Sequence, residues 1–224
     1  MSRRLASLAL LLLAGCAGGP AAPDWQANAH AALAAHTAAY LAGRDRVATN
    51  ELMIARREVA RTGAAEPMAR VELAACAARF ASLEAADCPG YEVLAGQAGE
   101  AGAANAAYAA YLAGHWQGLA VDLLPAVQQA VPGEGDALAV LPGIEEPLSR
   151  LVAAAALLRA GRLPPAGMAI AIDTASHQGW RRPLLAWLGL ERDRLATAGD
   201  IAGAAAAQRR MDYVTGKYGQ SGGR

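Results

Sequence analysis

Small and apolar residues recur at alternating steps of three and four along most of the chain, which is the spacing of one face of an α-helix. The clearest stripe consists of Ala69, Leu73, Cys76, Phe80 and Leu83. Between the stripes, glycine, proline and acidic residues provide the usual signals for helix ends. The pattern predicts helices over residues 25–42, 45–63, 67–85, 105–113, 116–131, 148–161, 181–197 and 200–214.

Some positions refine this assignment. Asp24 and Asp45 are expected to cap the first two helices. Pro125 is expected to kink the helix over 116–131, because proline lacks the backbone donor that a helix interior needs. Glycines at every third position make a helix over 91–104 doubtful. Apolar residues alternate over 168–172 as in a short strand, although the flanking residues favour a helix.

The composition supports a helical fold. Apolar residues make up 54% of the 224 residues and charged residues 18%, so the chain has the material for a buried core. Alanine is the commonest residue and the best helix former. We therefore expect an all-α fold of antiparallel helical hairpins. Two arrangements remain open, a repeat-like stack and an irregular helical bundle.

The charge pattern argues against a nucleic-acid partner. Acidic and basic residues both number 20, and no basic patch stands out that would neutralise phosphates. The arginine pairs at 56–57, 181–182 and 209–210 lie in predicted helices, and we interpret each pair as part of a solvated helix face.

The N-terminus has the build of an export signal. Arg3 and Arg4 precede an apolar run over residues 5–13, which is shorter than the roughly twenty residues that span a bilayer. The run ends in the sequence LAGC, whose last residue is Cys16. Here the chain resembles the lipobox of bacterial lipoproteins. An ordinary secretory signal that happens to contain a cysteine is the alternative.

The resemblance implies a lipid anchor. In that family a peptidase removes the segment before the cysteine, here residues 1–15, and acyl groups are attached to the thiol and the new amino group of the residue that stands here as Cys16. Two or three acyl chains hold a protein on a membrane without a spanning helix. In Gram-negative lipoproteins an Asp after the cysteine favours the inner membrane. Because Ala17 follows here, the implied location is the periplasmic face of the outer membrane.

The rest of the chain divides into a tether over 16–23, a helical domain over 24–215 with a candidate internal boundary near 132–143, and a frayed tail over 216–224. From Trp25 to the cysteines at 76 and 88, the helical domain is also similar to uncharacterised proteobacterial lipoproteins, which carry no assigned activity.

An internal echo bears on the arrangement of the helices. Residues 160–163 (AGRL) are echoed by residues 198–201 (AGDI), each at a junction between predicted helices. With Leu188 and Gly189 upstream, the second copy resembles the helical hairpins of tetratricopeptide-type repeats, which implies stacked hairpins. The sequence departs from that family, because the spacing from Gly189 to Gly199 is too long and the closing proline is absent.

Cys76 and Cys88 remain once Cys16 is modified. Two thiols of one small periplasmic domain usually pair, so we predict a disulfide, with two free thiols as the alternative. A helix that continued to Ala85 would carry the chain too far for the bond. The bond therefore requires a sharp return of the chain or a helix that ends near Ser82.

No motif indicates a catalytic, metal or cofactor site. His30 and His36 are six positions apart on one helix and point in different directions, while His115 and His177 are isolated. We interpret all four as ordinary surface or cap residues. The acidic pair at 145–146 suits the start of a helix.

Three aromatic residues leave a further alternative open. Tyr108, Tyr111 and Trp116 either line a groove or belong to the core, which is the commoner outcome for aromatic residues at this spacing.

Two hypotheses of function follow. The first is a non-enzymatic, lipid-anchored helical scaffold of the cell envelope that binds an envelope protein or a peptide. The second is an envelope enzyme or small-ligand binder whose residues meet only in three dimensions. A deep pocket with converging polar groups would favour the second hypothesis, and a broad concave apolar surface would favour the first.

Overall fold

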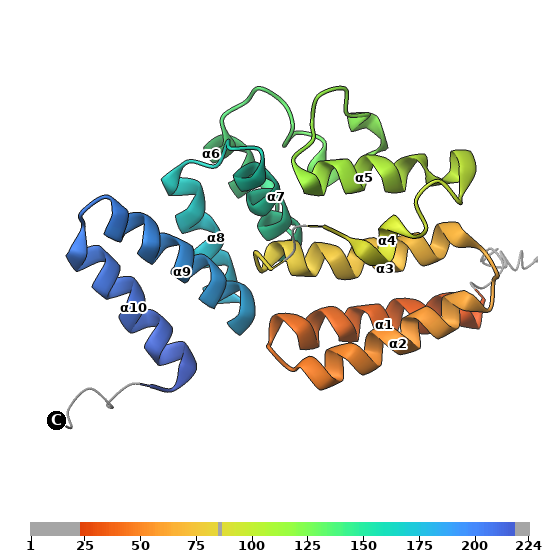
Figure 1. Ribbon diagram of the computed structural model, residues 1–224, viewed down its shortest axis with the longest axis horizontal. Helices are drawn as coiled ribbons and strands as arrows, with labels where there is room; N and C mark the ends of the chain where they lie inside the picture. Colours follow the sequence, from red (N-terminus) through yellow and green to blue (C-terminus); the bar gives the residue numbers. More distant parts are fainter. Residues whose placement is uncertain (1–22, 85–86, 218–224) are drawn as a thin grey trace, which may run out of the picture.

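The computed structural model describes residues 23–84 and 87–217, and the regular structure in these ranges is helical, which confirms the all-α prediction (Figure 1). Cys16 and the predicted signal peptide lie outside the described residues. The helices are α1 (Asp24–Leu41), α2 (Asp45–Ala60), α3 (Ala65–Ala81), α4 (Pro89–Glu92), α5 (Ala103–Ala113), α6 (Ala137–Val140), α7 (Pro147–Arg159), α8 (Pro165–His177), α9 (Arg181–Thr197) and α10 (Ile201–Thr215).

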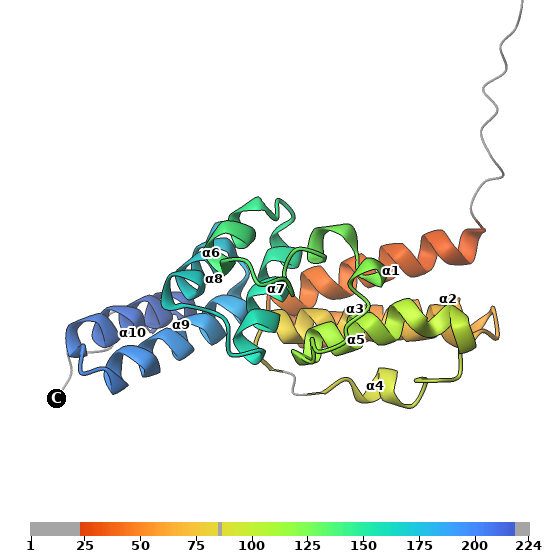
Figure 2. The same cartoon turned by 90° about the horizontal axis from the view of Figure 1, so that it is seen from above.

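The helices pack as a bundle. In Figure 1, α3 lies in the middle of the N-terminal half, between the α1–α2 hairpin and α5, while α8, α9 and α10 extend from the opposite end. Figure 2 shows the same elongated arrangement from above, with α10 at the far end from the start of α1. The main hydrophobic core joins α3, α5, α7, α8 and α9 and continues on both sides of residues 132–143.

Helix α7 is the most deeply buried element. Every residue from Leu151 to Leu157 is buried, as expected for a helix that is covered all round. Its first turn is capped by Glu146, whose carboxylate accepts hydrogen bonds from the backbone N–H groups of Leu148 and Ser149. The predicted role of the acidic pair at a helix start is thereby confirmed for Glu146.

The helix expected over residues 116–131 is wrong. Only two short 3₁₀ turns, Val121–Leu123 and Ala126–Gln128, are present there. Leu124 is extended at φ −73° and ψ 154°, because the ring of the following Pro125 disfavours the helical conformation in the residue before it. Pro125 therefore breaks the segment rather than bending it, and the segment crosses the surface as an irregular loop.

Other local expectations are resolved as follows. Residues 168–172 are helical within α8, and 91–104 contain only the short α4 and a 3₁₀ turn before α5. Asp24 and Asp45 are the first residues of their helices rather than their caps, and neither helix has a side-chain cap. Both carboxylates still lie beside the positive end of a helix dipole.

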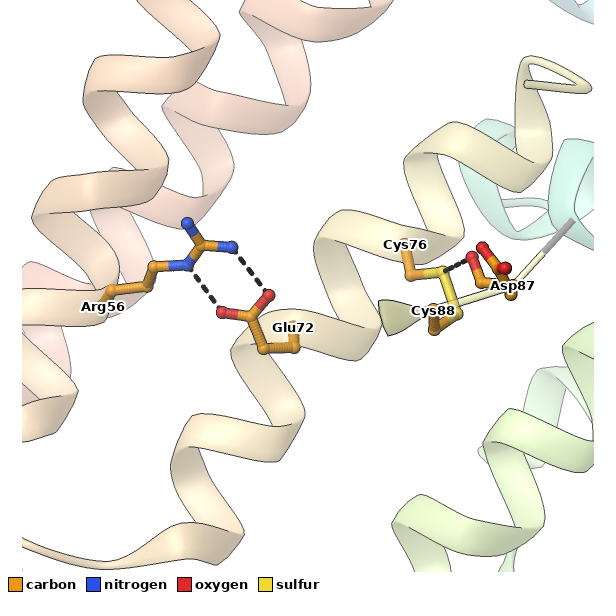
Figure 3. The surroundings of a disulfide bond; sticks show 5 residues. All are labelled: Arg56, Glu72, Cys76, Asp87 and Cys88. Carbon is orange, nitrogen blue, oxygen red and sulfur yellow. Dashed lines mark hydrogen bonds and ion pairs between the residues drawn. A yellow bond between two sulfur atoms is a disulfide. The ribbon is translucent and has the colours of Figure 1, made fainter. Parts of the chain in front are cut away.

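The chain turns sharply at the end of α3. The helix stops at Ala81, and Leu83 adopts the left-handed conformation at φ 57°. The stripe over Ala69–Phe80 is buried as predicted, and the early end satisfies the condition that the disulfide prediction placed on this helix. Cys76 and Cys88 are joined, with their Cα atoms 5.7 Å apart (Figure 3).

Two side chains of α9 attach the C-terminal helices to the rest. The Trp187 indole is fully buried, and its N–H donates to the carbonyl oxygen of Ala81 at 3.0 Å. The Arg182 guanidinium donates to the Tyr40 carbonyl oxygen at 2.8 Å and to Glu84 at 2.7 Å, and it also pairs with Asp45. The interpretation of Arg182 as part of a solvated face is therefore wrong, because three elements converge on its guanidinium.

Candidate apolar groove between α1, α3 and α5

A groove of about 810 Å³ lies along α3, between α1 and α5. The three helices run in the same direction (Figures 1 and 2), so the groove is bordered by the lengths of three helices rather than by their ends. The loop around Leu124 and the start of α7 close one side.

The space exists because the helices present small side chains to it. Ala34 and Ala38 of α1, Ala74 and Ala77 of α3 and Ala104 of α5 line the groove. Larger apolar side chains form the buried part of the lining, namely Leu41, Leu73, Leu124 and Val152. The lining is thus mainly apolar, and it is open to solvent at the exposed alanines Ala34, Ala38 and Ala104.

The polar side chains of the lining include His30 and Thr37 on α1, Arg70 on α3, Asn105 and Tyr108 on α5, and Glu146 and Ser149 at the start of α7. Thr37 and Asn105 already donate to the carbonyl oxygens of Leu33 and Glu66. The register of α1 and α3 places His30 and Arg70 at the same level, because the two helices end together where the Tyr40 hydroxyl donates to Glu84 at 2.5 Å. Counted back from that end, His30 and Arg70 occupy matching turns.

The charged groups of the groove already have partners inside the protein. Arg70 Nε donates to Glu66 Oε1 at 2.5 Å, and the Arg70 side chain is 70% exposed. Glu146 is occupied by the capping of α7. Both arrangements serve the fold, one as an ion pair within α3 and the other as the cap of α7.

The three aromatic residues divide between the two predicted alternatives. Tyr108 lines the groove, and burial raises the pKa of its phenol, with the charge of Glu146 acting in the same direction. The phenol therefore stays protonated and remains a hydrogen-bond donor. Tyr111 is fully buried and donates to Gln128 at 2.5 Å, and Trp116 packs against the core, with the Tyr111 and Trp116 rings 6.0 Å apart.

The histidines are not brought together. His30 is exposed at the groove, and His115 and His177 are exposed elsewhere. His36 corrects the prediction of a surface residue, because it is buried between α1 and α2. Its Nδ1 donates to the Ala48 carbonyl oxygen at 2.8 Å, and its buried Nε2 has no hydrogen-bond partner among the described residues. Within residues 23–84 and 87–217, no group of three or more His, Cys, Asp or Glu side chains could hold a metal ion.

The disulfide lies on α3, away from the groove lining. Cys76 Sγ is also 3.5 Å from the carbonyl oxygen of Asp87, and both cysteines are buried. One turn earlier on the same helix, Glu72 accepts two hydrogen bonds from the Arg56 guanidinium at 2.6 and 2.7 Å (Figure 3). The disulfide joins α3 to the segment before α4, and the Arg56–Glu72 pair joins α3 to α2. Both contacts therefore restrain α3, one of the helices that line the groove, at residues outside the lining.

Sequence reasoning missed the groove apart from Tyr108. The available signal was a second stripe on α1, formed by His30, Leu33, Thr37, Ala38 and Leu41, beside the stripe that faces α2. A helix with two adjacent apolar stripes has to face two neighbours, and here the second stripe faces the groove.

In the described part of the chain, no helix has the length and apolarity that crossing a membrane requires. No protein-family model matches the chain, and comparisons with curated proteins and with solved structures found no similar protein.

Proposed function

We propose that this chain is a lipid-anchored, non-enzymatic binding module of the cell envelope, and that the groove between α1, α3 and α5 is its binding site. The observation that carries the proposal is the groove itself, which is lined mainly by apolar side chains and whose polar residues Thr37, Asn105 and Glu146 are already bonded within the protein. Concave, mostly apolar sites with a few polar groups are the usual places where proteins hold ligands.

The lack of a catalytic arrangement in the groove supports a binding role. The charged side chains Arg70 and Glu146 both serve the fold, since Arg70 is bonded to Glu66 and Glu146 caps α7. Tyr108 is a protonated donor and not a base. A concave, mainly apolar surface is what the first sequence hypothesis, a non-enzymatic binding protein, requires, and the volume of about 810 Å³ also suits the small-ligand binder named in the second.

The anchor rests on the N-terminal sequence. The residues up to Cys16 resemble a lipoprotein signal, and residues 17–23 would separate the acyl groups from the start of α1. An extended chain spans at most about 3.3–3.6 Å per residue, so this tether allows the domain to stand roughly 25 Å from the membrane.

The anchor is tested with Cys16→Ser. The wild-type protein should incorporate a labelled fatty acid and sediment with membranes, and the variant should do neither. A wild-type protein without label, or a variant that keeps it, would contradict the anchor.

The binding site is tested with a fluorescent apolar probe, anilinonaphthalene sulfonate. The folded protein should enhance its fluorescence, and Ala38→Trp should abolish the enhancement by filling the groove. Ala35→Trp is the matched control, because Ala35 is exposed on the same helix and does not line the groove. Equal fluorescence from both variants would contradict the groove as the binding site.

A further inference from the structure

The dimensions of the groove restrict what it can hold. Its volume of about 810 Å³ lies within the range of roughly 300–1,000 Å³ typical of small-ligand sites. A helix with its side chains is about 10–12 Å across, so three turns of helix would occupy roughly twice that volume. A partner helix could insert only one face, whereas a single elongated small molecule fits completely.

The lining specifies an alkyl chain. From Leu33 through Leu73 to Val152 the groove presents aliphatic side chains, and Leu123 and Val127 add exposed apolar surface on the adjoining loop. Thr37 and Asn105 also line the groove, but their side chains donate to the carbonyl oxygens of Leu33 and Glu66. Apolar area is buried favourably whatever the detailed shape of the chain, so a flexible hydrocarbon matches this lining better than a ligand with polar groups along its length.

The charged residues of the lining specify the head group. Arg70 lies at the same level as His30, while Glu146 borders the groove at the start of α7, where its charge acts on Tyr108. An anion is favoured beside Arg70 and disfavoured beside Glu146. Arg70 presents five N–H donors, of which the bond to Glu66 uses the one on Nε, so the guanidinium keeps donors for a carboxylate.

From these three observations we infer that the groove binds one long-chain carboxylate, with its alkyl chain along α3 and its head group beside Arg70 and His30. This inference rests on the proposed binding role of the groove and names its ligand class. Glu66 is the internal competitor for the head group, because it already occupies one side of Arg70.

Calorimetric titration of hexadecanoate tests the inference on the full chain carrying Cys16→Ser, which bears no acyl group that could compete. One molecule should bind per chain, and decanoate should bind more weakly, by up to about fourfold for each methylene removed. Ala38→Trp should weaken binding on the order of tenfold or more, and Ala35→Trp should leave it unchanged.

A separate experiment tests the position of the head group. Arg70→Gln should weaken hexadecanoate binding roughly fivefold, as for an exposed ion pair, and should leave hexadecanol binding unchanged. Arg57→Gln is the control, since Arg57 is exposed on α2 and is not part of the groove. Glu66→Gln should strengthen hexadecanoate binding by releasing Arg70.

The outcomes separate the inference from the proposed function. If hexadecanoate does not bind while the fluorescent probe still binds in a manner blocked by Ala38→Trp, the groove is a binding site and the inference is wrong. If Arg70→Gln weakens hexadecanol as much as hexadecanoate, the head-group orientation is wrong. Thermal unfolding of each variant identifies those that lose binding by losing the fold.

Discussion

The two ends of the molecule are both antiparallel helix pairs, yet only one borders a large apolar groove. The α1–α2 pair has the groove of about 810 Å³ on one side, whereas the hollow between α8, α9 and α10 measures about 230 Å³ and is lined in part by Asp173, Glu191 and Arg210. Both regions are rich in alanine. Alanine content alone therefore does not create an apolar groove. The groove forms because α3 and α5 are placed beside the α1–α2 pair.

The two pairs also differ in how they are attached. The α1–α2 pair shares a small apolar core with α3, formed by Ala29, Ala32, Ala55, Val59 and Val71. The α9–α10 pair is attached through α9, and α10 contributes a single buried residue, Ala207. The comparison predicts that the C-terminal pair depends on a few side chains of α9, while the N-terminal pair depends on a distributed contact.

The largest expected effect is that of Trp187→Ala. The substitution removes a fully buried indole and its bond to Ala81, so it should lower the free energy of unfolding by about 3–5 kcal/mol. Urea denaturation followed by circular dichroism measures the loss. A loss below about 1 kcal/mol would mean that the C-terminal pair is held by something other than Trp187.

The next effect concerns the disulfide behind the groove. Replacing Cys76 and Cys88 with alanine should lower the free energy of unfolding by about 3 kcal/mol, because the cross-link restricts the unfolded chain. Mass spectrometry after alkylation without reduction tests whether the bond forms in the exported protein. Alkylation of both residues in the unreduced protein would contradict the bond.

A smaller effect is expected for Arg182→Gln. The variant loses the ion pairs with Glu84 and Asp45 and the contact of the guanidinium with the Tyr40 ring, at 4.3 Å from its centre. We expect a loss of about 1–2 kcal/mol that diminishes at high salt. Arg181→Gln is the control. Arg181 is exposed, so its substitution should change the free energy of unfolding by less than about 0.5 kcal/mol. Equal losses would remove Arg182 from the attachment.

The smallest effect is expected at the start of α10. Ile201 is 70% exposed, so Ile201→Ser should change the free energy of unfolding by less than about 0.5 kcal/mol. Val59→Ala, at a buried position of the N-terminal pair, should cost about 1–2 kcal/mol. The contrast tests whether α10 is as lightly packed as the comparison holds, and a large loss for Ile201→Ser would contradict it.

The C-terminal helices could be predicted closely from the sequence. The range 181–197 expected for one of them is the range of α9, and the glycines that follow α7 and α9 mark the turns as expected. Local signals suffice where every helix is followed at once by its antiparallel partner. The prediction is wrong over 116–131, where Pro125 holds Leu124 in the extended conformation and so breaks the segment instead of kinking a helix.

The groove could not be predicted in the same way. Its lining comes from α1, α3, α5, the loop at Leu124 and α7, so its existence depends on how these elements are spaced. The burial of His36, by contrast, could have been predicted from the sequence. It continues the spacing of Ala29, Ala32 and Ala39, and that stripe already indicated that the ring would be buried.

Glu146 connects the groove to the folding of its most buried helix. The same carboxylate that borders the groove holds the amide protons of Leu148 and Ser149 at the start of α7. A ligand that draws this carboxylate away would break both hydrogen bonds and speed the exchange of the two amide protons with solvent. A ligand that leaves the carboxylate in place and covers the groove would slow that exchange. Hydrogen–deuterium exchange at these two amides thus reports how a ligand contacts the groove beside Glu146.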